Sequence, residues 1–257
     1  MGQSVAVILI IIFLVFLFIP MAFLTNNQQQ VGEIKQSLNL SAKALIKAIE
    51  VDSENANGFS QGYNRGRQQE VVVNKEDLLR EFYDILYRNY YIDGGFQDTK
   101  QRLVLKILVV NDRFYLAKED DQWSHPYFFL LEDTGLNVYL DIRDDIVYYY
   151  DDYGNMTYAS LQSFGISKEE KNQRIINRIN QVVAMETKTE FKDGLEIMIQ
   201  NSQNVEGDYR RRFQNFNVLE GITFFVIYRG DTGLEINNQM YEYKNYNVVG
   251  YTLRSKV

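Results

Sequence analysis

The chain begins with one long, uninterrupted apolar segment. Residues 5–24 carry no charged side chain, and the first charge in the sequence is Glu33. A helix of about 20 residues is about 30 Å long, which matches the hydrocarbon core of a bilayer. The segment is longer than the apolar core of a signal peptide and no A-x-A sequence follows it, so we expect a retained membrane anchor. Its representative residues are Val5, Ile8, Ile12, Phe16, Pro20 and Leu24.

After the apolar segment, hydrophobic residues recur every three or four positions up to about residue 51. This spacing predicts a helix with one apolar face and polar remaining faces. Two interpretations remain open: an ordinary first helix packed on a domain, or one long helix that continues from the membrane as a stalk. The positions expected to pack are Val31, Ile34, Leu38, Ala42, Leu45 and Ile49.

Residues 52–70 separate this helix from the rest of the chain. They are rich in glycine, asparagine and serine and have no hydrophobic period, so they are interpreted as a linker. Residues 71–257 then form the predicted head. Val71–Val73 is a candidate short strand, and Asn74 is a candidate N-cap for a helix that continues to about Tyr91, where Gly94-Gly95 ends it.

Three successive β-hairpins are predicted in the middle of the head, because apolar segments alternate there with turn sequences. A capping box, Ser167 with Glu170, then predicts a helix that extends to about residue 200. Two further strands are expected at 222–228 and 246–253. The hairpins are 103–110 with 113–118, 127–131 with 136–142, and 146–150 with 156–161.

These elements predict an α+β fold. An N-terminal transmembrane helix continues as an amphipathic stalk, and the head contains an antiparallel β meander and two further helices. The domain boundaries follow as anchor and amphipathic helix over residues 1–51, linker over 52–70 and head over 71–257.

Composition excludes several function classes. The net charge is −7, from 34 acidic and 27 basic residues, so no nucleic-acid partner is expected. Cysteine is absent, which excludes disulfides and thiolate metal sites. His125 is the only histidine, and it precedes a proline at the start of a strand, as loop residues often do. No phosphate-binding or hydrolase motif occurs, so we expect neither an enzyme nor a cofactor.

Three groups of residues are candidates for binding. Arg210, Arg211 and Arg212 form the densest basic sequence and could contact a partner's acidic groups. Tyr148 and Tyr150 lie in a tyrosine-rich segment, and exposed tyrosine favours interfaces, although packing in a β core explains such residues equally. The carboxylates of Asp144, Asp151 and Asp152 are weak calcium candidates without EF-hand spacing, and a solvated face with a hairpin turn is the preferred explanation for them.

The extreme N-terminus carries a family resemblance. Gly2-Gln3-Ser4-Val5-Ala6-Val7, followed by the apolar segment and the amphipathic helix, resembles type IV pilin-like proteins, and in particular the pseudopilins of tight-adherence systems. The resemblance covers about 50 residues and implies processing after Gly2 and packing of the N-terminal helix against other subunits. The family has a glutamate five residues after the glycine, where this chain has Val7, so the resemblance implies a minor subunit or one that stays in the membrane.

The sequence therefore predicts a single-pass, membrane-anchored structural protein, pseudopilin-like or minor-pilin-like, in an envelope filament, pilus or secretion machine. Its expected partners are membrane lipid and other machine subunits. The body is expected outside the cytoplasm, although the lysines that follow the span favour the opposite orientation under the positive-inside rule. The alternative is a membrane-anchored extracytoplasmic ligand-binding or sensor domain.

Overall fold

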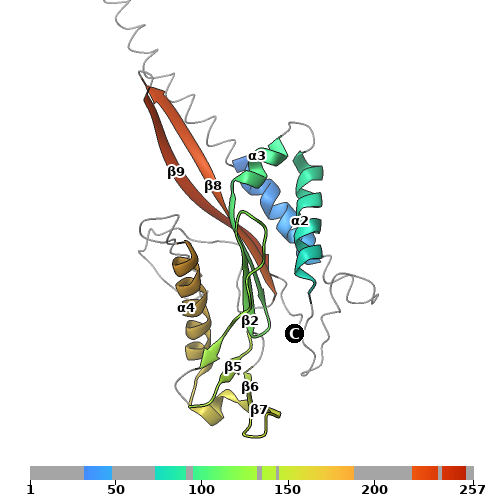
Figure 1. Ribbon diagram of the computed structural model, residues 1–257, viewed down its shortest axis with the longest axis vertical. Helices are drawn as coiled ribbons and strands as arrows, with labels where there is room; N and C mark the ends of the chain where they lie inside the picture. The colour runs from blue at the N-terminus through green and yellow to red at the C-terminus, as the bar shows by residue number, and fades with distance from the viewer. Residues whose placement is uncertain are drawn as a thin grey trace, which may run out of the picture.

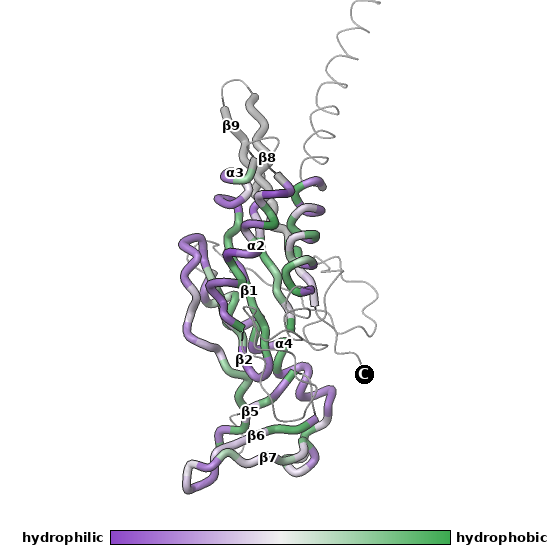
Figure 2. The backbone as a smooth tube through the Cα atoms, turned by 90° about the vertical axis from the view of Figure 1, so that its right-hand side faces the viewer, coloured by the Kyte–Doolittle hydropathy of each residue, from purple (hydrophilic) through white to green (hydrophobic). Residues whose placement is uncertain are grey.

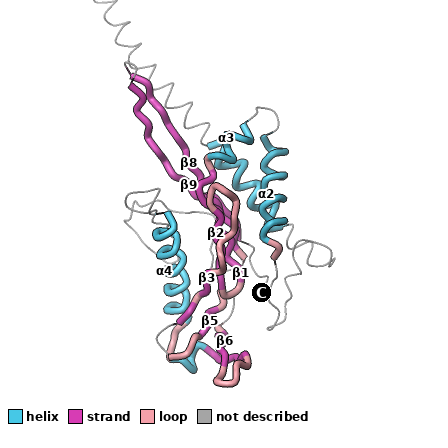
Figure 3. The backbone as a smooth tube through the Cα atoms, in the orientation of Figure 1, coloured by secondary structure: helices cyan, strands magenta, loops and turns pink. Residues whose placement is uncertain are grey.

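The computed structural model describes residues 32–47, 73–90, 95–131, 135–142, 145–187, 222–236 and 239–252. Within these ranges the chain is α+β, with four α-helices and two antiparallel sheets (Figures 1 and 3). The helices are 32–47, α2 (Lys75–Tyr90), α3 (Gly95–Gln101) and α4 (Lys168–Thr187), and a short 3-10 helix, η2, covers Leu161–Phe164.

Nine strands form the two sheets. The five-stranded sheet has the order β3-β2-β1-β8-β9, and the four-stranded sheet has the order β4-β5-β6-β7. The strands are β1 (Leu103–Val110), β2 (Arg113–Ala117), β3 (Tyr127–Phe128), β4 (Leu130–Leu131), β5 (Val138–Leu140), β6 (Ile146–Tyr150), β7 (Met156–Ser160), β8 (Thr223–Ile236) and β9 (Gln239–Thr252).

Strand β1 lies at the centre of the five-stranded sheet, and all eight of its residues are buried. Its sequence, LVLKILVV, is hydrophobic at every position except Lys106, and Figure 2 shows the strand mostly in the green of hydrophobic residues. A strand that is apolar on both sides requires cover on both faces of the sheet. Helices from distant parts of the chain provide that cover.

One face of the sheet is covered by helix 32–47 and α2. Leu38, Leu45 and Phe82 are fully buried there against side chains of β1 and β8. The described positions of the predicted apolar stripe, Ile34, Leu38, Ala42 and Leu45, all belong to this cluster or pack against it. Helix 32–47 is therefore part of the domain core over these residues, as the first of the two interpretations expects.

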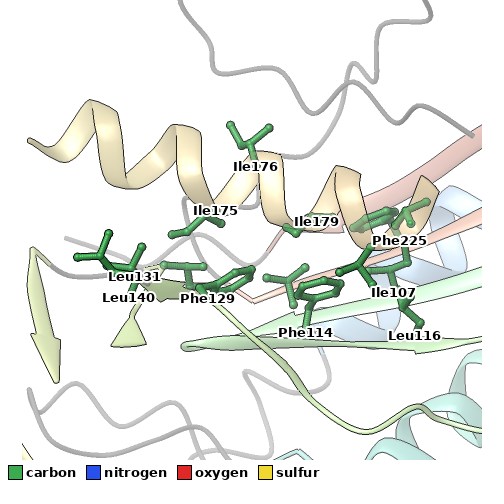
Figure 4. Close-up of a cluster of buried hydrophobic side chains, with 14 of the residues drawn as sticks. Ile107, Phe114, Leu116, Phe129, Leu131, Leu140, Ile175, Ile176, Ile179 and Phe225 are labelled. Atoms are coloured by element: carbon green, nitrogen blue, oxygen red, sulfur yellow. The ribbon is translucent and has the colours of Figure 1, made fainter. Parts of the chain in front are cut away.

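The opposite face is covered by α4, together with the inner side of the four-stranded sheet. Ile175 and Ile179 of α4 face Ile107, Phe114 and Phe129, as Figure 4 shows, and all five side chains are buried. Burying an isoleucine or phenylalanine contributes about 1.5–3 kcal/mol, so this layer is a main source of the head's stability.

The predicted meander is divided between the two sheets, which corrects the single meander expected from the sequence. The expected strand 127–131 breaks at Phe129: β3 before it pairs with β2, and β4 after it pairs with β5. The Phe129 amide donates to the Asp112 carbonyl at 2.8 Å, and its own carbonyl accepts from Leu140 at 2.8 Å. Phe129 therefore connects the sheets, because its backbone bonds to both.

The predicted helix starts are confirmed. The Asp77 amide donates to the Asn74 side chain at 3.3 Å, and the Glu170 amide donates to Ser167 Oγ at 3.1 Å. Only half of the expected capping box forms, because the Glu170 carboxylate pairs instead with Arg174 at 2.9 Å. The head also has a helix that the sequence did not indicate, α3, which begins at Gly95 where a helix end was expected.

None of the helices in the described ranges is long and apolar enough to cross a bilayer. The predicted span 5–24, the linker 52–70, Gly2, Val31 and Ile49 lie outside those ranges.

Gly250 gives a direct test of the packing between β8 and β9. A Cβ atom at this position would lie 2.3 Å from Phe225 Cβ and 2.8 Å from the Phe224 carbonyl oxygen. We expect Gly250→Ala to lower the free energy of unfolding by about 1–3 kcal/mol, the usual cost of overpacking. Gly32→Ala is the control, because a Cβ there meets no atom within 4 Å and alanine favours helix. Equal melting temperatures for the two variants in thermal unfolding would contradict the close approach.

Candidate functional site

The outer face of the four-stranded sheet carries two of the four exposed aromatic side chains in the described part of the chain, Tyr150 and Tyr158. Strand alternation turns Val138, Leu140 and Val147 inward, where they join the core beneath α4. The alternate positions, Tyr139, Tyr148 and Tyr150, therefore point away from the core. The turn sequences after β5 and β6 fix this register, so the sequence itself places tyrosines on the outside.

Three tyrosines from neighbouring strands form a row across this face. Tyr139 of β5 pairs with Tyr148 of β6, and Tyr148 pairs with Tyr158 of β7. The rings of Tyr139 and Tyr148 are stacked, with centroids 4.7 Å apart and an interplanar angle of 3°. Tyr150 lies edge-on to Tyr139 at 6.0 Å, and its strand partner is Met156. We call Tyr139, Tyr148, Tyr150, Met156 and Tyr158 the tyrosine surface.

A hydrogen bond to the turn between β1 and β2 of the five-stranded sheet holds the tyrosine surface in place. The Tyr148 hydroxyl donates to Asp112, which lies in the turn between β1 and β2. Arg113 Nε bonds the other carboxylate oxygen of Asp112 at 2.6 Å, and its guanidinium lies 4.8 Å from the centroid of the Phe128 ring. Asp112 is almost completely buried, so its hydrogen bonds fix Tyr148, the middle member of the row.

Three members of the tyrosine surface are open to solvent. Tyr150, Met156 and Tyr158 are 50%, 47% and 43% exposed. Aromatic pairs of this kind contribute about 0.5–1.5 kcal/mol beyond burial, so the rings are pre-ordered on the surface. A rigid, half-exposed group of tyrosines loses little side-chain entropy when it binds a partner.

The sequence-predicted binding residues divide into two groups. Tyr148 and Tyr150 are both on the tyrosine surface, as just described. Arg210, Arg211, Arg212 and Asp144 lie outside the described residues.

The remaining calcium candidates belong to the turn between β6 and β7. The Asp151 carboxylate accepts hydrogen bonds from the Tyr153 and Asn155 amides at 2.9 and 2.8 Å. The bond from Asn155 is the main reason that the pKa of Asp151 is lowered. Asp152 is exposed beside it, and the described residues contain no group of three or more acidic or histidine side chains suited to a metal. Asp151 therefore shapes a tight turn.

His125 lies in the loop before β3 and is exposed, as its sequence context indicated. Ser124 beside it is committed to the backbone: its Oγ accepts from the Leu116 amide at 3.0 Å and donates to the His125 carbonyl.

A second polar cluster lies beneath α2 and includes a buried lysine. Lys106 Nζ is 2.7 Å from Asp121 Oδ1 and donates to the Lys118 carbonyl at 2.6 Å. Tyr83 donates to the same carboxylate oxygen at 2.6 Å, and Lys100 pairs with the other oxygen at 3.3 Å. Asp121 has a positive φ of 60°, a backbone conformation that aspartate adopts more readily than most residues.

Burial controls the titration of this cluster. It lowers the pKa of Lys106 and, together with the hydrogen bond to Asp121, raises the pKa of Tyr83 far above its usual range. Burial alone would also raise the pKa of Asp121, but hydrogen bonds from Lys106 and Tyr83 and the nearby positive charges lower it overall. The carboxylate therefore stays ionised between two lysines and a phenol, which is the arrangement of a structural ion pair.

Sequence reasoning overlooked Tyr139, Met156 and Lys106. Tyr139 could have been found by aligning the predicted hairpins, because pairing β5 with β6 places it opposite Tyr148. The signal for Lys106 is a single charge inside a continuous apolar strand, which requires a buried partner.

Comparison with protein-family models, with curated proteins and with solved structures finds no match for this chain.

Proposed function

We propose that this chain is a single-pass, membrane-anchored assembly protein without catalytic activity, and that its head binds another protein through the tyrosine surface. The observation that carries the proposal is the ordered row of Tyr139, Tyr148 and Tyr158, with Tyr150 half exposed beside it. Tyrosine is enriched at protein interfaces because its ring buries a large area while its hydroxyl stays hydrogen-bonded.

The ring orientation favours a protein partner over a sugar. The faces of Tyr139 and Tyr148 that meet in the stack are not free, and the Tyr148 hydroxyl is bonded to Asp112. Flat stacking of a sugar ring requires a free aromatic face, whereas protein contacts use edges and hydroxyls readily. The alternative of a ligand-binding or sensor domain is therefore less well supported by this surface.

The charges around the surface indicate the chemistry of the partner. Residues 145–160 contain Asp145, Asp151 and Asp152 and no basic residue. Asp145 and Asp152 are exposed, and Asp145 lies 3.8 Å from Lys168 Nζ, so Asp152 is the carboxylate most open to a partner. A partner that carries arginine or lysine at its contact would complement Asp152 and cover the rings with its aliphatic stems.

The anchoring part of the proposal comes from the sequence. The apolar span 5–24 and the pilin-like start at Gly2 favour a pseudopilin-like or minor-pilin-like component of an envelope filament or secretion machine, with its body outside the cytoplasm. Helix 32–47 supports a close connection between anchor and head, because its apolar face is part of the head's core.

The proposed contact is tested by replacing two exposed tyrosines, Tyr150→Ser with Tyr158→Ser. A tyrosine at the centre of a contact contributes about 2 kcal/mol or more, which is roughly 30-fold in binding, so we expect the double variant to weaken partner binding by more than that single-residue factor. The measurement is the yield of proteins that co-purify with the full chain from detergent-solubilised membranes.

Tyr87→Ser is the matched control, because Tyr87 is 46% exposed but lies on α2. We expect it to co-purify the same proteins as the unmodified chain. If the double variant retains its partners at the same yield as Tyr87→Ser, the tyrosine surface is not the contact site.

A further inference from the structure

The hairpin of β6 and β7 carries three of the four exposed large aromatic side chains in the described part of the chain. They are Tyr150, Tyr153 and Tyr158, and the fourth, Tyr87, lies on α2. Tyr153 is the most exposed of the four, at 89%. It lies in the turn between the two strands, at the end of the molecule that is lowest in Figure 1.

The turn that carries Tyr153 is ordered by hydrogen bonds to Asp151. The Asp151 carboxylate accepts from the backbone amides of Tyr153 and Asn155 at 2.9 and 2.8 Å, and from the Asn155 side chain at 3.3 Å. The Asp151 amide donates to the Asn155 carbonyl, and the Gly154 amide donates to the Asp151 carbonyl, both at 2.9 Å. Gly154 has a φ of 79°, which glycine adopts without strain. Five bonds within five residues therefore fix the backbone at Tyr153.

The turn itself does not require a tyrosine at position 153. Its special positions are filled by Asp151, Gly154 and Asn155, whereas Tyr153 contributes a backbone amide that most residues possess. Turn positions usually hold small or polar residues. A ring that is 89% exposed buries little apolar area and so adds little to the stability of the fold. The ring is therefore available for a contact outside the head.

An ordered turn lowers the cost of binding through this ring. Because the backbone is already fixed, binding restricts mainly the two side-chain torsions of Tyr153. The carboxylate of Asp151 is committed to the turn, whereas Asp152 is exposed next to the ring. Tyr150 and Met156 are strand partners on either side of the turn, so the tyrosine surface continues directly into it. The turn thus offers one ring and one carboxylate beside the contact already proposed.

We propose that residues 151–155 enter a pocket on the protein partner, where Tyr153 fills an apolar cavity and Asp152 pairs with an arginine or lysine at the rim. This inference rests on the proposed function, and it names the shape and the charge of the partner's site. Residues 146–160 contain two aspartates and no lysine or arginine, so a basic rim complements the hairpin and an acidic one is repelled. Tyrosines that fill a partner's pocket are typical binding hot spots.

The test places the photoreactive residue azidophenylalanine, which is close to tyrosine in size, at position 153 of the full chain in intact membranes. Mass spectrometry of the adduct identifies the attached molecule and peptide. We expect one protein, attached through a peptide that contains arginine or lysine. Asp152→Lys should lower the adduct yield about tenfold or more, because it opposes the basic rim.

Two substitutions of Asp151 separate the order of the turn from its composition. Asp151→Ala removes the acceptor for the two amides and leaves the probe in place, so the adduct yield should fall. Asp151→Asn keeps an acceptor that forms the same kind of turn, so the yield should be retained. The melting temperature of each variant checks that the head remains folded.

A second measurement keeps the probe at position 150. There Tyr153→Ser should lower the adduct yield roughly 30-fold or more, the loss expected of a hot spot, and Tyr87→Ser should leave it unchanged.

Adducts at 153 that consist only of lipid or glycan, or that are insensitive to both Asp152→Lys and Asp151→Ala, would overturn the inference. A protein adduct from 150 with none from 153 would overturn the pocket contact and leave the proposed function intact. No protein adduct from either position would contradict both, so the two failures are distinguishable.

Discussion

Replacing Asp121 with asparagine is expected to lower the free energy of unfolding by about 3–5 kcal/mol. The substitution removes the charge that compensates Lys106, which is completely buried in the central strand. Asparagine keeps the size of the side chain and tolerates the positive φ at this position, so the backbone is not strained. Chemical denaturation of the full chain in detergent, followed by circular dichroism, measures the loss.

A double substitution, Lys106→Met with Asp121→Asn, is the control for this prediction. It removes both charges and fills the strand position with an apolar side chain, so we expect it to recover most of the stability. A loss below about 1 kcal/mol for Asp121→Asn alone would show that Lys106 does not depend on Asp121. A double variant as unstable as the single one would show that packing, and not the charge, is what the substitution damages.

The cluster of Asp121, Lys106 and Tyr83 is expected to make the free energy of unfolding of the head fall at acid pH. The pKa of Asp121 is lower in the folded state than its usual value, so the unfolded chain takes up this proton first as the pH falls. The stabilisation is fully present above the unfolded value of about 4 and is lost as the pH falls through the folded value. The asparagine variant lacks this group, and its unfolding free energy should depend less on pH in that range.

Leu38→Ala is expected to lower the free energy of unfolding by about 2–5 kcal/mol, the range for leucine in a closed core. Leu38 has no exposed surface and packs between α2 and the five-stranded sheet. Helix 32–47 would lose one of its three large, fully buried side chains, and Leu45 and Ile46 would remain to hold it on the head. Urea unfolding of the full chain in detergent, followed by the fluorescence of Trp123, measures the effect.

Leu40→Ala provides the comparison within the same helix. Leu40 is 50% exposed, so truncating it should change the unfolding free energy by no more than about 0.5 kcal/mol. Equal effects at the two positions would mean that the helix does not pack on the head as described. The interpretation of this segment as a free stalk would then be the better one.

Much of the local structure was predictable because it depends on neighbouring residues. Asn74 and Ser167 mark helix starts through hydrogen bonds that span three residues. The turn at Asn111-Asp112 connects β1 and β2 with the register expected of a two-residue hairpin. The apolar period of helix 32–47 identified its buried face, although the sequence alone could not say what covers it.

The arrangement of the sheets could not be predicted because it depends on distant contacts. Tyr127–Leu131 is one apolar segment in the sequence, and only the backbone bonds of Phe129 to Asp112 and Leu140 divide it between two sheets. The full length of β8 was hidden for a related reason. Gly230 and Gly233 weaken the strand pattern, and pairing with β9 outweighs their low strand propensity.

The tyrosine surface was likewise only partly predictable from the sequence. The sequence indicated Tyr148 and Tyr150 as contact candidates but left open whether they are buried or exposed. Alternation along β6 shows that they lie on the outer face. Val147 points into the core, so Tyr148 and Tyr150, which alternate with it, point outward. The addition of Tyr139 and Tyr158 required the cross-strand register, which joins residues that are far apart in the chain.

The central claim, that the head binds a protein through the tyrosine surface, is tested most directly by photo-crosslinking in intact membranes. A photoreactive amino acid is placed at Tyr150 of the full chain, and the same group at Tyr87 on α2 is the reference. The account predicts a discrete protein adduct from position 150 that is absent from position 87 and is reduced by Tyr158→Ser. The absence of an adduct at 150, or the same adducts from both positions, would contradict it.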